Sequence, residues 1–83
     1  MKDWFVYIVR CHDDSLYTGI TRDPVRRVDE HNNNDLLGSK FTRARRPVNL
    51  VYQEPHRDRS QATKREIEIK RLCRKDKEAL ILE

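Results

Sequence analysis

The chain has 83 residues, of which 36% are hydrophobic and 39% charged, and its formal net charge is +4 at pH 7. This length allows one domain with one modest core, which we expect to span residues 1–83. The sequence holds no apolar run of about 18 residues that could cross a membrane. It also lacks the apolar stretch of a secretory signal, so we expect a cytoplasmic protein. Cys11 and Cys73 form neither a zinc pattern nor a disulfide framework, and we expect both to be buried or half-buried thiols.

The chain begins with the pattern of a β-hairpin. Trp4–Arg10 and Leu16–Thr21 are apolar, β-prone runs, and the turn-forming residues 12–15 separate them. Each run carries a tyrosine, Tyr7 in the first and Tyr17 in the second. On this pattern alone, both tyrosines are core or rim residues of the hairpin.

A helix with a clear start follows the hairpin. Asp23 can cap its N-terminus and Pro24 suits the first helical position, and the helix should end near Asn32. Residues three or four apart share a helix face, so Arg27 and His31 should project together. A histidine at a helix end is also a common neutral surface residue, so this pair alone does not establish a site.

A polar, basic loop follows the helix and runs to Pro47. In this loop Phe41 is interleaved with basic residues and a threonine, a pattern that suits a phosphate clamp. Residues 57–77 add nine basic side chains against four acidic ones. The pattern favours a polyanionic partner whose binding weakens with salt, and the alternative is a solvated basic face without a partner. The candidate nucleic-acid contacts are Lys40, Thr42, Arg43, Arg45 and Arg46.

The rest of the chain predicts one more strand and two helices. Val48–Gln53 reads as a short, largely apolar strand, which Pro55 ends. Ser60 can cap a second helix that runs to about Arg74. Asp76–Leu82 suits a short terminal helix that packs on the core. We therefore expect a small α/β domain in the order β-β-α-β-α with a further C-terminal helix, built on a three-stranded sheet flanked by helices.

One carboxylate falls on the buried stripe of the second helix. Ala62, Glu66, Ile69 and Cys73 follow one another at spacings of four, three and four residues. A carboxylate on a buried or half-buried face needs a partner, because an unpaired charge there is costly. Glu66 could pair with an arginine, or it could face a cleft and hold a metal ion. The pattern alone leaves both open.

Taken in order, these segments resemble the GIY-YIG nuclease superfamily. The two signature segments are present as Val6-Tyr7-Ile8 and Tyr17-Thr18-Gly19. The first glycine and the second isoleucine of the family name are replaced, which affects packing positions more than reacting groups. The resemblance covers nearly the whole chain, and the chain looks most like the small, stand-alone bacterial YhbQ-like members. The further matches are Asp23–Asn32, Lys40–Arg43, Arg45–Val48, Leu50–Tyr52 and Ala62–Glu66.

The resemblance implies a metal-dependent endonuclease that hydrolyses DNA phosphodiester bonds in repair or recombination. Tyr17 would be the general base, because it matches the tyrosine of the second signature. Arg27 would hold the scissile phosphate, and the competing Arg26 should point about 100° away on the helix. Glu66 would bind a single Mg²⁺ or Mn²⁺ ion, with waters and phosphate oxygens completing the shell.

The resemblance also assigns supporting roles. Tyr7 would hydrogen-bond the attacking water or Tyr17, and His31 would be a secondary proton acceptor or phosphate ligand. Gly19 suits a place where backbone must approach closely, and Asn32 would order the helix end and the nearby loop through side-chain hydrogen bonds.

Two functional hypotheses remain open from the sequence. The first is the endonuclease, and the second is a non-catalytic nucleic-acid-binding or interaction module that retains the same fold. They differ in whether Tyr17, Arg27 and Glu66 converge on one cleft. No separate target-recognition domain is apparent, so we expect contacts with the nucleic-acid backbone, and a protein partner could supply specificity for branched or damaged DNA.

Overall fold

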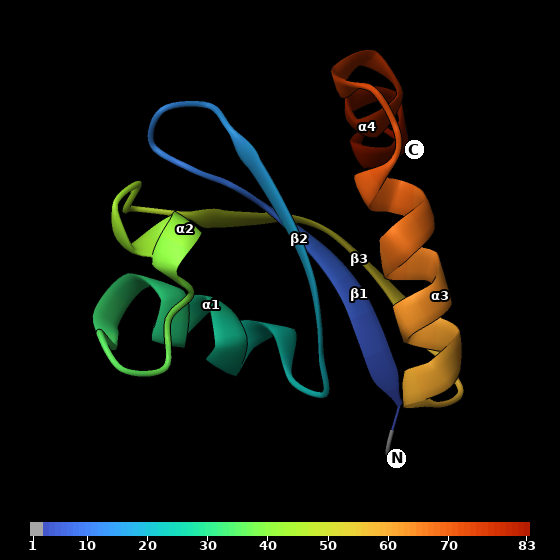
Figure 1. Cartoon of the computed structure of the whole chain (residues 1–83), viewed down its shortest axis with the longest axis horizontal. Coiled ribbons are helices and arrows are strands. Elements are labelled where there is room, and N and C mark those ends of the chain that lie inside the picture. The colour runs from blue at the N-terminus through green and yellow to red at the C-terminus, as the bar shows by residue number, and fades with distance from the viewer. Residues whose placement is uncertain (1–2) are drawn as a thin grey trace.

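The computed structural model describes residues 3–83, which form a three-stranded sheet with helices on both sides (Figure 1). The strands are β1 (Trp4–Arg10), β2 (Leu16–Thr21) and β3 (Asn49–His56). The helices are α1 (Pro24–Asn33), α2 (Lys40–Arg43), α3 (Arg59–Lys70) and α4 (Arg74–Ile81). The expected α/β class and the three-stranded sheet are confirmed. No helix within the described range is long and apolar enough to span a membrane.

The central strand of the sheet is β1, and both of its neighbours run antiparallel to it in the order β2-β1-β3. The register pairs Tyr7 with Gly19 and Val9 with Tyr17. Paired residues of an antiparallel ladder lie on the same face of the sheet. Tyr7 and Tyr17 therefore share one face, two pairing positions apart.

The helices cover opposite faces of the sheet. Figure 1 shows α1 and α2 on one side and α3 and α4 on the other. The core under α3 consists of Val6, Ile8, Ala62 and Ile69, with Leu80 and Ile81 of α4 packed against it. The core on the other face consists of Tyr7, Val9, Cys11 and Val48, joined by Tyr17, Val28 and Leu50. The two tyrosines thus belong to the layer that contains α1.

Local capping explains where the helices begin. Asp23 accepts a hydrogen bond from the Arg26 backbone N–H at 3.1 Å, and Pro24 is the first residue of α1, as the sequence predicts. The cap of α3 is Asp58, which accepts from Gln61 N at 2.9 Å, so the prediction that Ser60 caps this helix is wrong.

The boundaries after α1 differ from the sequence prediction in several places. Pro55 does not end β3 but lies within it, which is possible because β3 is an edge strand and one side of it makes no ladder bonds. The second predicted helix ends at Lys70 as α3 rather than near Arg74, and the terminal helix predicted over Asp76–Leu82 is α4, which begins at Arg74. Cys73 lies between the two helices and is exposed, contrary to expectation, whereas Cys11 is buried. Leu82 is 85% exposed and does not pack on the core.

Candidate active site

The Tyr7 ring lies against the backbone of β2 at Gly19. A Cβ atom at Gly19 would be 2.6 Å from the Tyr7 hydroxyl oxygen, so only glycine leaves room for the ring in this position. Tyr7 is 1% exposed, and its hydroxyl lies 2.8 Å from His31 Nε2. The sequence prediction that Gly19 allows a close backbone approach agrees with this geometry.

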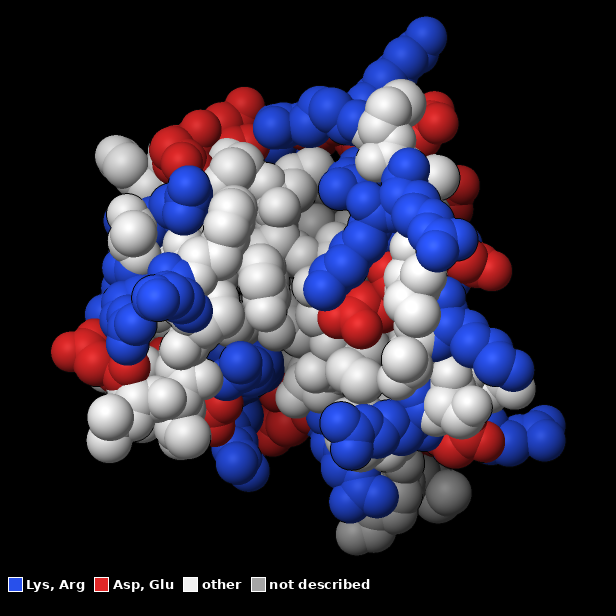
Figure 2. Space-filling model, viewed as in Figure 1, with Lys and Arg blue, Asp and Glu red and all other residues white. Residues whose placement is uncertain are grey.

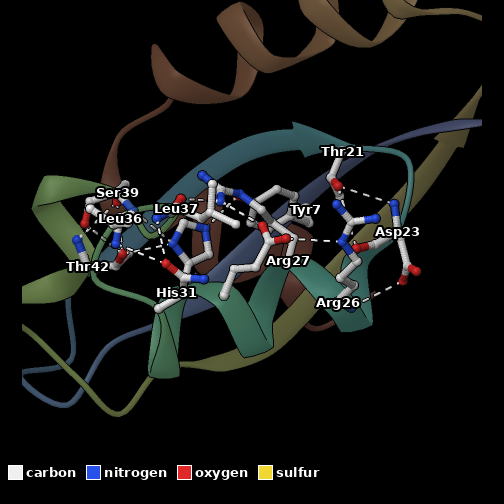
Figure 3. Close-up of polar contacts among 12 residues, drawn as sticks. Tyr7, Thr21, Asp23, Arg26, Arg27, His31, Leu36, Leu37, Ser39 and Thr42 are labelled. Carbon is white, nitrogen blue, oxygen red and sulfur yellow. Dashed lines mark hydrogen bonds and ion pairs between the residues drawn. The ribbon is translucent and has the colours of Figure 1, made fainter.

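A hydrogen-bonded chain runs inward from Tyr7 through His31 to the start of α2 (Figure 3). His31 Nδ1 is 2.8 Å from Thr42 Oγ1, and Thr42 Oγ1 is 2.8 Å from Ser39 Oγ. Ser39 also caps α2 by accepting from Thr42 N at 3.1 Å. Tyr7, His31 and Thr42 are each at most 1% exposed, so this part of the polar network is buried, and Ser39 at its end is half-buried.

Burial sets the protonation states in this network. Burial lowers the pKa of His31 to about 4, and the positive charge of Arg27 adds to the effect, so the imidazole is neutral at pH 7. Burial also raises the pKa of Tyr7 to about 12, with the nearby Tyr17 adding to the shift and Arg27 opposing it. Tyr7 is therefore a protonated phenol at neutral pH. The complete burial of His31 also rules out the expected direct contact between this side chain and a phosphate.

Tyr17 is the more exposed of the two tyrosines. Its ring centroid lies 6.5 Å from that of Tyr7 and 5.4 Å from that of His31. The ring stacks on Phe41 of α2, with centroids 5.7 Å apart and an interplanar angle of 25°. The guanidinium carbon of Arg45 stands 4.0 Å from the Phe41 centroid. Phe41 and Arg45 thus fix the outer side of Tyr17. An aromatic residue in a basic loop is the one feature of the sequence that points to this contact.

Arg27 lies beside Tyr7, and Glu30 holds it in place. Arg27 Nη1 donates to Glu30 Oε1 at 3.0 Å and to the carbonyl of Leu37. Both bonds use Nη1, so the Nε and Nη2 groups can donate to a phosphate. Arg26 also pairs with Glu30 at 3.0 Å, but its side chain is 75% exposed, whereas that of Arg27 is 25% exposed. The helical spacing predicts this difference in exposure. It did not lead us to Glu30 as the partner of both arginines, although Glu30 lies three residues after Arg27 and four after Arg26.

Glu66 comes from α3, on the other side of the sheet. Because β2 is an edge strand and α3 packs across it and β1, Glu66 lies near enough for its charge to raise the pKa of Tyr7. The Glu66 side chain is 19% exposed and forms an ion pair with Lys70 at 3.2 Å rather than with an arginine. Within residues 3–83 no group of three or more His, Cys, Asp or Glu residues could hold a metal ion. A metal held by Glu66 would therefore have at most one further ligand of these residue types from the described part of the chain.

The basic loop contributes fewer surface groups than its sequence predicts. Thr42 is completely buried and bonds to His31, so the prediction that it contacts nucleic acid is wrong. Arg46 donates to the His31 carbonyl at 2.6 Å and pairs with Asp35 at 2.8 Å, so it holds α1 against the loop. The exposed candidates are Lys40 and Arg43 of α2.

Asn32 joins the end of α1 to the start of β3. Its Nδ2 donates to the Val48 carbonyl at 2.9 Å, and its Oδ1 accepts from the Val48 N–H at 2.7 Å. This two-sided bond orders the helix end, as the sequence predicts.

The surface over β2 is a largely uncharged strip with Lys and Arg side chains on both flanks (Figure 2). One flank belongs to the side of α1 and α2 and the other to α3. Such an arrangement can place a polyanion over the strand that carries Tyr17.

Comparison with known proteins places these features in a wider group. Residues 3–79 match the family described as the GIY-YIG catalytic domain. A UPF0213 protein of Desulfotalea psychrophila is 55% identical over 78 residues, which cover 94% of this chain and 70% of that protein. A UPF0213 protein of Staphylococcus aureus is 52% identical over 83 residues, which cover 100% of this chain and 99% of that protein.

Two solution NMR structures share the fold. A protein from E. faecalis is 41% identical with a TM-score of 0.64, and its alignment covers 95% of this chain and 82% of that one. The UPF0213 protein from Bacillus halodurans is 39% identical with a TM-score of 0.60 and the same coverage of both chains.

Proposed function

Because the chain belongs to the GIY-YIG family, we propose that it is a divalent-metal-dependent endonuclease that hydrolyses DNA phosphodiester bonds. The observation that carries the proposal is the grouping of Tyr7, Tyr17 and Arg27 on one side of the sheet. The charge of Glu66 also reaches this site, where it raises the pKa of Tyr7. A binding module needs the basic surface but has no need for a buried phenol, a neutral imidazole and a carboxylate whose charge acts on that phenol.

In this mechanism Tyr17 is the general base. A free tyrosine has a pKa near 10, so its phenolate needs a neighbouring cation at neutral pH. Arg27 supplies a positive charge in this region, and its free N–H groups hold the non-bridging oxygens of the scissile phosphate. The water oxygen attacks phosphorus while the Tyr17 phenolate takes one of the water protons. The bond from phosphorus to the 3′-oxygen breaks, and the 3′-oxygen leaves as a hydroxyl after taking a proton from solvent.

Tyr7 and His31 act behind the reacting groups. Tyr7 stays protonated, so its hydroxyl can hydrogen-bond the attacking water or Tyr17 but cannot serve as the base. His31 fixes the direction of that hydroxyl through the 2.8 Å contact with Nε2. This role replaces the proton acceptor or phosphate ligand that the sequence indicates.

The donor set at Glu66 fits a hard cation that keeps most of its waters. Mg²⁺ is commonly held by one or two carboxylates together with waters and substrate phosphates. The present partner of Glu66 is Lys70, whose side chain is 52% exposed and can move aside. A bound Mg²⁺ or Mn²⁺ would supply Lewis-acid stabilisation of the leaving oxygen.

The test is cleavage of supercoiled plasmid and branched DNA in Mg²⁺ or Mn²⁺ by Tyr17→Phe, Arg27→Gln and Glu66→Gln. Matched controls come from the same chain: Tyr52→Phe, Arg71→Gln and Glu68→Gln change the same residue types outside this site. We expect nicking that depends on metal, is lost in the three site variants and is kept in the controls.

Salt-sensitive DNA binding without cleavage by any variant would refute the nuclease and favour the non-catalytic module. A comparison of branched, damaged and intact duplex DNA tests the predicted place in repair or recombination. Addition of a candidate partner protein to the same assay tests whether specificity comes from outside the chain.

A further inference from the structure

A cavity of about 440 Å³ lies next to Arg27, at the end of β2 and the start of α1. Its walls include Trp4, Ile20, Arg22 and Arg26 as well as Arg27, and we call it the Trp4 pocket. Its volume falls in the range of about 300–1,000 Å³ that is typical of small-ligand sites. Because Arg27 lines it, the pocket is continuous with the position proposed for the scissile phosphate.

Two arginines from different elements lie over the Trp4 indole, and one of them, Arg22, also lines the pocket. The guanidinium carbons of Arg22 and Arg59 each lie 5.4 Å from the Trp4 ring centroid. Arg22 belongs to the turn between β2 and α1, and Arg59 is the first residue of α3. Cation–π attraction to the ring holds each of the two guanidinium groups beside Trp4.

The acidic residues of the pocket are already engaged. Asp23 caps α1 by accepting from the Arg26 backbone, and Glu30 pairs with both Arg26 and Arg27. Neither Arg22 nor Arg59 forms an ion pair with any residue in the range 3–83. The charge on these two side chains is therefore available to an anion.

We propose that the Trp4 pocket binds the nucleotide that flanks the scissile phosphate. The phosphate of this nucleotide contacts Arg22 and Arg59, and its base or sugar packs on the Trp4 indole. Arg27 holds the neighbouring, scissile phosphate, so the two phosphates are consecutive along one strand. This inference rests on the proposed nuclease function and adds the subsite that positions its substrate.

The test uses the single tryptophan of the chain as a reporter. Full-length protein is titrated with a fluorescein-labelled oligonucleotide in a chelator, so that binding occurs without cleavage. Oligonucleotide anisotropy measures total binding, and Trp4 emission with acrylamide quenching measures entry into the pocket. We expect quenched emission and reduced acrylamide access, with the same midpoint as the anisotropy change.

Two variants connect the signal to the arginines. Arg22→Gln and Arg59→Gln should each raise KM for cleavage and leave kcat unchanged. Each should also lower the slope of log K against log salt by about 0.7–0.9, the value for one lost phosphate contact. Arg71→Gln, beyond the other end of α3, is the control and should change neither quantity.

The outcomes separate the two proposals. The proposal for the Trp4 pocket is overturned if DNA is bound and cleaved while Trp4 emission stays unchanged. It is also overturned if both arginine variants keep the wild-type KM and salt slope. Either result leaves the proposed nuclease function intact. If the wild-type protein shows no metal-dependent cleavage, the proposed function itself is refuted, whatever the emission of Trp4 shows.

Discussion

Replacing Gly19 by alanine should destabilise the protein and displace the Tyr7 hydroxyl. The added methyl group would lie 2.6 Å from the hydroxyl oxygen of Tyr7, 2.8 Å from Cζ and 2.9 Å from Cε1. Tyr7 cannot easily give way, because it is 1% exposed and its hydroxyl lies 2.8 Å from His31 Nε2. The clash must therefore shift the ring, the strand or both.

The size of the effect follows from two opposing contributions. Overpacking a filled core costs about 1–3 kcal/mol of unfolding free energy. Alanine gains about 0.4–1 kcal/mol in return at a compatible backbone, because the unfolded chain has fewer conformations to lose. Gly19 has no positive φ, so backbone strain adds nothing. We expect a net loss of about 1–2 kcal/mol, with a fall in Tm of about 4–8 °C for each kcal/mol in a domain of this size.

Urea denaturation of four proteins gives a double-mutant cycle: wild type, Gly19→Ala, Tyr7→Leu and the double variant. Tyr7→Leu removes all three atoms that the new methyl would meet. We therefore expect the cost of Gly19→Ala to disappear, or to become a small gain, in the Tyr7→Leu background. An equal cost in both backgrounds would refute the reasoning, and so would a wild-type background in which Gly19→Ala costs nothing.

Three further predictions concern buried and charged groups. Thr42→Val should lower the unfolding free energy by about 1–3 kcal/mol in urea denaturation, because His31 Nδ1 loses its 2.8 Å partner, while Thr42→Ser should retain most of the stability. An NMR titration should give His31 a pKa of about 4, which lies below the unfolded value near 6.5. The unfolded chain therefore takes up the proton first as pH falls, so the unfolding free energy should drop between pH 6.5 and 4. The variant His31→Gln should remove this drop. A His31 midpoint near the unfolded value would contradict the buried, neutral state. The hydrogen-bonded Arg10 guanidinium lowers the pKa of Glu78 to about 2, so the ion pair should stabilise the protein above the unfolded pKa near 4.3 and lose its effect as pH falls to 2. The difference in Tm between wild type and Glu78→Gln should therefore shrink over that range. A difference in Tm that does not change with pH would contradict this role of the ion pair.

The sequence predicts best the features that depend on a few neighbouring residues. Both hairpin strands match the predicted bounds, because the turn residues and the β-prone runs lie next to each other. The start of α1 follows from Asp23 and Pro24 in the same way. The second long helix is less well predicted, since Asp58 and Ser60 are both good capping residues and only the geometry selects between them.

The candidate site is only partly predictable. Helical spacing predicts that Arg27 and Arg26 point in different directions, which agrees with their different exposure. Hairpin pairing places Tyr7 and Tyr17 on one face of the sheet. The direction of the loop side chains does not follow from spacing. Thr42 lies within a run of basic residues yet is buried, because its hydroxyl bonds to His31, eleven positions earlier.

The sequence by itself determined the class of fold, the order of its main elements and the family resemblance, because turns, caps and motifs are signals within short stretches. Only the tertiary structure decided which side chains are buried and which of them form hydrogen bonds with each other. The Tyr7 hydroxyl meets His31 across 24 positions, and Pro55 is tolerated in a strand because that strand lies at the sheet edge. Burial, and with it the pKa of about 4 at His31 and about 12 at Tyr7, arises from contacts between segments that are distant in the chain.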